Sequence, residues 1–432
     1  MSYDQWHTNM LAEAQRLQAQ NLLDPNYQPL FVEIFWPSKA WVDDSAQPVV
    51  NTPIIPRLNA IESLPAPVLD HVRRETFIDN YRTAMDPAGV RGDQYDTDFG
   101  RIYDLLHLPQ LPTSDEINEF VQTLYTYKIQ DPQSDPTEKN EMINVSVTSV
   151  VKRLVEKKPL IPPQIKVGPA IDKVLLLQQN PAATVGDNLL DFFRLFTFWT
   201  MKARAAVVGQ TGVKPLLEDL AQVNNTLNAN NLPRVRIHLF SHSFGAKLCS
   251  AALNAVQQPL EPLVDTFVLL LGAFSQFSFS SDIPVQPGTA GSYASIVKDG
   301  RVVNPLVVIY SQYDLANKLF YPLAMKFSLD PIFTLPFPGD SPPAPVEPIV
   351  LTDKFGSIGA DGTQGLDAAR QRDMDMQGLD SAYKWDKMNL QGVYCLSVDG
   401  GNFIKQGNFP VGAHNDLNHP EIFHLALAMS LR

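Results

Sequence analysis

The stretch from Val235 to Ala252 constrains the fold more than any other part of the chain. It reads VRIHLFSHSFGAKLCSAA. Its first half is a short β-type run and its second half is rich in small residues and helix formers, so we expect a strand that turns sharply into a helix. Ser243 lies on the turn. This arrangement is typical of a nucleophile elbow, in which a serine on a strained strand-to-helix bend is held clear of a sheet.

The elbow pattern carries two further expectations. Backbone and neighbouring helix approach closely at such a bend, so small residues are expected two positions before and two after the serine, where Ser241 and Gly245 stand. The start of the helix also points unpaired N–H groups at any negative charge that forms beside Ser243. The pattern alone is only moderately specific, because an ordinary strand, turn and helix with an incidental hydroxyl would give the same letters.

The rest of the chain has the element order of an α/β protein. Residues 5–22 are expected to form an amphipathic helix, and residues 29–36, with the sequence PLFVEIFW, a buried strand. Three apolar runs follow the serine at 266–271, 306–310 and 393–398. Because helical segments separate these runs, we predict an α/β fold with a mostly parallel sheet.

Residues 37–186 differ in character from the sequence on either side. Prolines are frequent, charged helical pieces occur, and no convincing series of strands is present. Long insertions on α/β scaffolds grow from the strand ends at which substrates bind, so we interpret 37–186 as a helical cap or lid on a core formed by 1–36 and 187–432. A separate small domain unrelated to the site is the alternative. The aromatic segment 189–208 is expected in the core or in the wall of an apolar pocket.

Composition limits the partners and the chemistry. The 432 residues carry 46 acidic and 34 basic side chains, a net charge of −12 at pH 7, so nucleic acids and anionic membranes are poor partners. Cys249 and Cys395 are the only cysteines and form neither a metal-binding pattern nor a disulfide framework. We expect no metal, no signal peptide, no transmembrane segment and a reducing, cytoplasmic compartment.

A serine hydroxyl needs a base that takes its proton and a carboxylate that orients the base. Asp314 comes four residues after the apolar run 306–310, and His414 lies in the loop VGAHND ahead of the closing helix. Each has a competing interpretation, because Asp314 is also well placed to cap the helix that follows it, and His419 is a second candidate base. We expect Ser243 as the nucleophile, His414 as the base and Asp314 as the orienting carboxylate.

Three short motifs resemble the α/β-hydrolase superfamily and stand in its order between strands: SHSFG at 241–245, SQYD at 311–314 and GAHND at 412–416. WPS at 36–38 and WTMKARA at 199–205 are similar to segments of intracellular serine hydrolases in that superfamily. The resemblance covers residues 1–36 and about 190–432. It implies an α/β-hydrolase fold and hydrolysis of carboxylic esters, as in esterases and lipases, through an acyl-serine intermediate and without a cofactor.

The resemblance also implies that the backbone N–H of Phe244 donates to the oxyanion, and we expect Trp36, Ser38 and His242 to contact the substrate, a small ester with an apolar acyl group. The strand and His-Gly loop that precede the first helix in this superfamily have no counterpart ahead of residues 5–22. That loop supplies a second oxyanion donor, whose loss costs about 2.7–4 kcal/mol. We therefore expect a sheet without its first strands, and a binding or scaffold protein with impaired catalysis is the alternative function.

Overall fold

The computed structural model describes about three quarters of the chain. The described residues are 3–25, 27, 29–34, 66–86, 89–108, 110, 112–129, 132–133, 135–138, 147–155, 185–257, 263–322, 324–325, 352–381, 383–407 and 411–432. Trp36 and Ser38 lie outside them, so their contact with substrate stays a prediction. The division into a core and a helical cap likewise stays a prediction.

In the described part of the chain, five strands form one parallel sheet in the order β1-β2-β3-β5-β4. Their bounds are β1 His238–His242, β2 Thr266–Leu270, β3 Leu306–Tyr310, β4 Gln371–Asp375 and β5 Cys395–Asp399. The central strands β2 and β3 read as continuous apolar runs because helices cover both faces of a parallel sheet. The predicted α/β class and parallel sheet are therefore confirmed.

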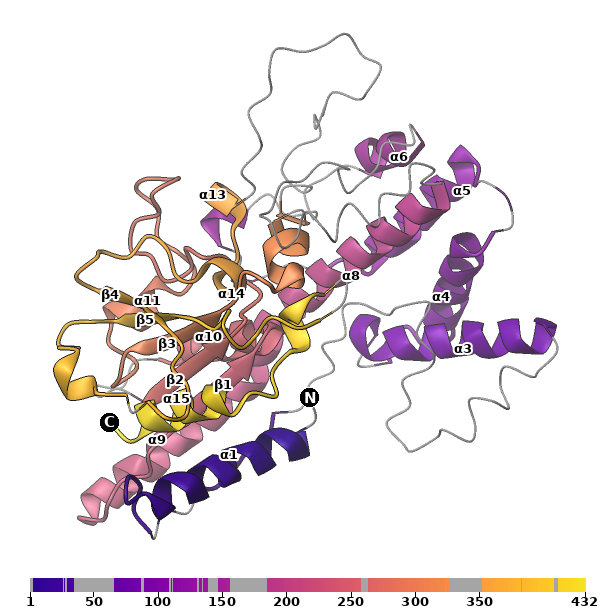
Figure 1. Cartoon of the computed structure of the whole chain (residues 1–432). Coiled ribbons are helices and arrows are strands. Elements are labelled where there is room, and N and C mark those ends of the chain that lie inside the picture. The colour runs from indigo at the N-terminus through magenta and orange to yellow at the C-terminus, as the bar shows by residue number, and fades with distance from the viewer. Residues whose placement is uncertain are drawn as a thin grey trace.

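Alternate residues of β2 pack on opposite faces of the sheet. Phe267 and Leu269 belong to the hydrophobic cluster of α8 (Val185–Val208) and α10 (Phe244–Ala255). Val268 and Leu270 belong to the cluster of α15 (Pro420–Ser430) on the other face. The helix α1 (Tyr3–Ala19), predicted over 5–22, packs against α15 on that same side (Figure 1).

The edge strands carry polar residues. His238 at the start of β1 is exposed, and the nearby Arg236 makes an ion pair with the buried Asp265. These polar positions conflict with a strand covered on both faces, and the edge position of β1 removes the conflict. The sequence QRDMD of β4 gave no strand signal for the same reason, because its side chains are exposed or half-buried.

The prediction of a buried strand at 29–36 is wrong for the part that the structure describes. Residues 29–34 form no strand, and Leu30 and Val32 are 90% and 64% exposed. Apolar alternation signals a strand only where the pleated surface packs on a neighbour. Here the described contact is a ring contact between Phe31 and His7, with centroids 4.5 Å apart.

A group of helices lies to one side of the sheet: α3 (Ala66–Met85), α4 (Asp93–Leu106), α5 (Ser114–Thr126) and α6 (Val147–Val155). Figure 1 shows α8 running from the sheet into this group. On α8, Phe193 packs on Phe77 at 5.5 Å between ring centroids, and Phe198 packs on Phe244 at 5.1 Å. The aromatic segment is buried core, as expected, and it joins the helical group to the sheet.

The remaining short elements connect the strands. They are the π-helical turns η3 (Gly209–Val213) and η4 (Ala316–Phe320), the helices α9 (Lys214–Ala229), α11 (Ala294–Lys298), α13 (Thr352–Phe355) and α14 (Ile358–Asp361), and the 3₁₀ turns η1 (Pro136–Glu138), η5 (Trp385–Lys387) and η6 (Ala413–Asn415). Within the described part of the chain, no helix has the length and apolar character needed to cross a membrane.

Candidate active site

Ser243 stands directly between β1 and α10, where the sequence predicts it. Its backbone has φ +56° and ψ −125°, a strained conformation for a residue with a side chain. Three backbone hydrogen bonds hold this conformation. The N–H of Ser243 donates to the carbonyl of Leu270 at 3.0 Å, and its carbonyl accepts from Ala246 at 3.0 Å and Ala273 at 3.3 Å. The sharp strand-to-helix turn is thus tied to the end of the neighbouring strand.

The predicted steric need for a small residue at Gly245 is wrong. A Cβ atom at Gly245 would meet nothing within 4 Å. The close approach to α10 comes instead at Gly209 in η3, where a Cβ atom would lie 2.2 Å from the carbonyl oxygen of Leu248. Ser241 is buried, and its hydroxyl donates to the carbonyl of Val268 at 3.2 Å.

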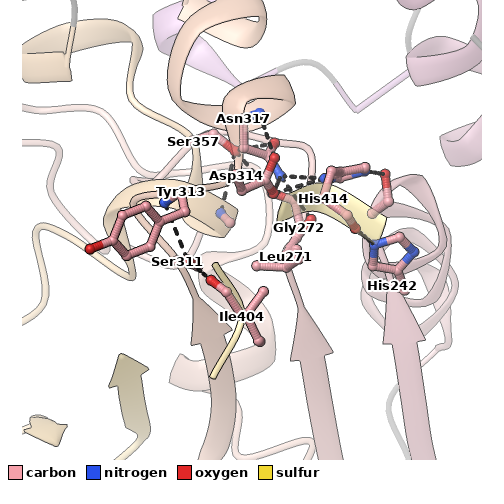
Figure 2. Close-up of polar contacts among 12 residues, drawn as sticks. His242, Leu271, Gly272, Ser311, Tyr313, Asp314, Asn317, Ser357, Ile404 and His414 are labelled. Atoms are coloured by element: carbon pink, nitrogen blue, oxygen red, sulfur yellow. Dashed lines mark hydrogen bonds and ion pairs between the residues drawn. The ribbon is translucent and has the colours of Figure 1, made fainter. Parts of the chain in front are cut away.

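The three predicted catalytic side chains converge. The Oγ of Ser243 lies 2.7 Å from Nε2 of His414, and Nδ1 of His414 lies 2.8 Å from Oδ2 of Asp314 (Figure 2). Asp314 is fully buried and the side chain of His414 is 12% exposed. An ionised carboxylate only accepts hydrogen bonds, so Nδ1 of His414 carries the proton and Nε2 is free to accept from the serine hydroxyl.

The turn that carries His414 rests directly on Asp314. An isolated antiparallel bridge joins Asp314 to Gly412. Gly412 has φ +58°, and a Cβ atom there would lie 2.5 Å from Cγ of Leu315 and 2.6 Å from the carbonyl oxygen of Tyr313. Only glycine fits this position, so the close contact of the two loops sets the distance between the imidazole and the carboxylate.

The competing interpretations are resolved by the hydrogen bonds. His419 bonds through Nε2 to Oδ1 of Asp416 at 2.9 Å, so it does not reach Asp314. The capping role of Asp314 is real as well, because Oδ1 accepts from the backbone N–H of Asn317 at 3.0 Å. One carboxylate thus caps η4 with one oxygen and bonds the imidazole with the other.

His242, next to Ser243, contacts the backbone of His414. Its Nε2 donates to the carbonyl oxygen of His414 at 2.9 Å, and the two rings lie 4.8 Å apart (Figure 2). Burial, together with the nearby imidazole of His414, holds the pKa of His242 well below its usual 6.5. His242 is therefore a neutral donor that supports the His414 loop, a role that sequence reasoning missed. Its predicted contact with substrate stays a prediction.

Phe244 opens α10, so its N–H is one of the first four donors that find no acceptor within a helix. Its side chain is buried against Phe198. The helix therefore presents a donor and its positive end next to Ser243.

Metal-binding and thiol chemistry have little support in the described residues. No group of three or more His, Cys, Asp or Glu side chains could hold a metal ion there. Cys249 and Cys395 are buried, and burial raises the pKa of each thiol to about 12. Both thiols are therefore protonated and unreactive at neutral pH.

The fold and the site define an α/β protein with a hydrogen-bonded serine, histidine and aspartate at the carboxyl ends of parallel strands. Comparison of the chain with family models, with curated proteins and with solved structures finds no match.

Proposed function

We propose that the protein is a serine hydrolase of the α/β-hydrolase type that cleaves carboxylic esters. The observation that carries the proposal is the continuous chain of hydrogen bonds from Ser243 through His414 to Asp314, with distances of 2.7 and 2.8 Å. Its members come from three separate loops, and the serine has the strained backbone of an elbow. A serine, imidazole and buried carboxylate in this order form the arrangement that activates a hydroxyl for acyl transfer.

The proposed reaction has two halves. Oγ of Ser243 attacks the ester carbonyl carbon while its proton passes to Nε2 of His414, and Asp314 stabilises the resulting imidazolium. The tetrahedral intermediate breaks its bond to the alcohol oxygen, which takes the proton from Nε2. Water then loses a proton to Nε2 and attacks the acyl-serine, and the carboxylic acid leaves as Ser243 regains its proton.

The negative oxygen of the intermediate is stabilised at the start of α10. The N–H of Phe244 is the proposed donor, and the positive end of the helix adds to its effect. Aromatic residues of α8 reach this point through the contact of Phe198 with Phe244. An apolar acyl group is therefore the proposed substrate feature.

A binding or scaffold protein without turnover is the alternative function. It predicts that the hydroxyl, imidazole and carboxylate lie too far apart for hydrogen bonds. The distances given above favour the enzyme instead. Slow acylation without release of acid would indicate impaired catalysis, so turnover must be measured as well as acylation.

The test is hydrolysis of p-nitrophenyl esters from acetate to octanoate by the full chain. We expect multiple turnovers, loss of activity in Ser243→Ala, and wild-type activity in Ser250→Ala. Ser250 is a matched control because it lies on α10, which begins directly after Ser243, is fully buried, and has a hydroxyl without a hydrogen-bond partner. Equal hydrolysis by the wild type and Ser243→Ala would overturn the proposal.

A further inference from the structure

Asn317 connects the predicted triad carboxylate to the end of β2. It lies in η4, three residues after Asp314, and is 1% exposed. Its Nδ2 atom donates to Oδ2 of Asp314 at 2.7 Å and to the carbonyl oxygen of Leu271 at 2.9 Å (Figure 2). Its backbone N–H donates to Oδ1 of Asp314 at 3.0 Å. Asn317 therefore bonds both oxygens of this carboxylate.

The partners of the amide leave one orientation for it. A carboxylate and a backbone carbonyl only accept, so the NH₂ group faces Asp314 and Leu271 and uses both hydrogens there. The amide oxygen then faces the hydroxyl of Ser357 at 2.8 Å, whose single hydrogen also has the carbonyl of Gly272 as an acceptor at 2.9 Å. Reversing the amide would place its oxygen against two acceptors inside the protein. Each polar atom of the Asn317 side chain thus faces a hydrogen-bonding partner.

The backbone is strained at Leu271, the residue that follows β2. Its backbone has φ +48°, a conformation that a leucine rarely adopts, and its side chain is fully buried. Its N–H donates to the carbonyl of Ile309 at 2.9 Å, while its carbonyl accepts from Asn317. Strained residues persist where the surrounding contacts hold them. The bond from Asn317 thus joins a strained turn after β2 to the carboxylate after β3.

Two donors converge on one oxygen of Asp314. Nδ1 of His414 and Nδ2 of Asn317 both bond Oδ2, and the two nitrogens lie 3.5 Å apart. Two N–H groups cannot bond each other, so this separation reflects a shared acceptor. A carboxylate held at both oxygens by Asn317 cannot rotate without breaking these bonds.

We infer that Asn317 is a positioning residue, whose amide holds the Asp314 carboxylate in the orientation that accepts the N–H of His414. The inference rests on the proposed function. Asn317 is buried and acts through Asp314, so its loss should slow the chemical step and leave ligand binding unchanged. A misplacement of about 1 Å in such a group can slow the reaction by up to about 100-fold.

The test uses a fluorophosphonate, which forms an Oγ–P bond at Ser243 as fluoride leaves and the serine proton passes to His414. We expect Asn317→Leu to lower the maximal labelling rate by about 10- to 100-fold with an unchanged half-saturating concentration. Asn304→Leu is the matched control. Its amide is also buried, donating to Thr266 Oγ1 and the Met429 carbonyl at 3.3 Å each, and it should keep the wild-type rate.

Asn317→Asp keeps the shape of the side chain and gives a second readout. At neutral pH it places a carboxylate against that of Asp314, and two such groups share a proton as the pH falls. The introduced carboxyl can then donate through its O–H. We expect the labelling rate of Asn317→Asp, relative to the wild type, to rise as the pH is lowered from 8 to 5. The same ratio for Asn317→Leu should stay flat.

The outcomes separate the inference from the proposed function. A wild type that is not labelled contradicts the proposed function. A labelled wild type with an equal maximal rate in Asn317→Leu overturns the role of Asn317. A labelling rate of Asn317→Asp, relative to the wild type, that is independent of pH also overturns the role of Asn317. This second measurement can still be made if Asn317→Leu does not fold.

Discussion

Ser243 has a backbone conformation that serine seldom adopts, and the surrounding hydrogen bonds stabilise it. The Leu270 carbonyl and the N–H groups of Ala246 and Ala273 all bond its backbone. Strain of this kind costs about 1–3 kcal/mol and persists at functional sites because the rest of the fold over-determines it. The hydroxyl is thereby held 2.7 Å from His414 rather than turned into the sheet.

A single substitution tests the carboxylate: Asp314→Asn should lower the rate of the proposed ester hydrolysis by about 10³- to 10⁴-fold at neutral pH. An amide that donates to His414 would leave the proton on Nε2, where it cannot accept from the serine. The variant should remain folded, because the side chain keeps its size in a buried site. The measurement is kcat/KM for a p-nitrophenyl ester alongside thermal unfolding. A folded variant with wild-type kcat/KM would remove Asp314 from the mechanism.

The residues that bear chemical motifs were predictable from the sequence, and those that support them were not. Ser243, Asp314 and His414 each follow an apolar run in the order that the triad requires, and these are the three residues that converge. The contacts of Asn317 and His242 depend on side-chain geometry after folding. An Asn three residues after a capping Asp is too common a pattern to carry that information.

At the scale of elements, the loop of His414 depends on Gly412. Gly412→Ala would bring a Cβ atom to 2.5 Å from Leu315 and require φ +58°. We expect this loop to shift and the esterase kcat to fall by about 10- to 100-fold, with the fold retained. Gly245→Ala is the matched control, since the space beside Gly245 is open and its φ is not positive. Equal kcat values for the two variants would contradict this account of the loop.

The docking of α1 on α15 depends on a buried cluster of charged groups. His424 on α15 bonds Glu13 at 2.9 Å through Nδ1 and donates to the carbonyl of Ser381 at 3.0 Å through Nε2. The hydrogen bond to Glu13 raises the pKa of His424 above its usual 6.5. Burial acts to raise the pKa of Glu13, but hydrogen bonds from Arg16 and His424 outweigh it and lower that pKa below 4.5.

The signs of these shifts define a pH window for stability. The contribution of His424 is fully present below pH 6.5 and is lost as the pH rises through its folded pKa. The contribution of Glu13 is present above pH 4.5 and is lost as the pH falls through the folded pKa of Glu13. We expect the difference in Tm between the wild type and His424→Gln to be largest between these values and to shrink toward pH 9. A difference that grows with pH would contradict the ion pair.

Element prediction succeeded where burial and hydropathy agree. The strands β2, β3 and β5 are apolar and central, so their sequences indicated them directly. The edge strand β4 is polar and gave no such signal. The apolar residues 29–34 gave a false strand signal, because an apolar alternating run becomes a strand only when a neighbouring strand pairs with it.

In the whole molecule, α8 joins one face of the sheet and the helices α3 to α6 in a single hydrophobic cluster. Its aromatic residues contact α3 and α4 through Phe193, and α10 through Phe198. A single cluster of buried residues extends from Phe77 in α3 to Val308 in β3. Ser243 therefore lies at the start of a helix, α10, that packs in the same hydrophobic cluster as the group of helices beside the sheet.

Because the cluster is continuous, we expect the sheet and the group of helices beside it to unfold together. Phe193→Ala should lower the free energy of unfolding by about 3–5 kcal/mol. Tryptophan fluorescence and circular dichroism should report the same single transition. Phe31→Ala is the matched control and should cost less, because Phe31 is only half-buried. Two separate transitions, with only one of them shifted by Phe193→Ala, would show that the helical group folds independently.

The central claim is that Ser243, activated by His414, is a nucleophile. The most direct measurement is peptide mass spectrometry of the folded full chain after treatment with a fluorophosphonate. We expect one adduct per chain, on the peptide that contains Ser243, and none in His414→Ala at the same reagent concentration and time. Folded wild-type protein without an adduct, or with its adduct on another residue, would contradict the claim.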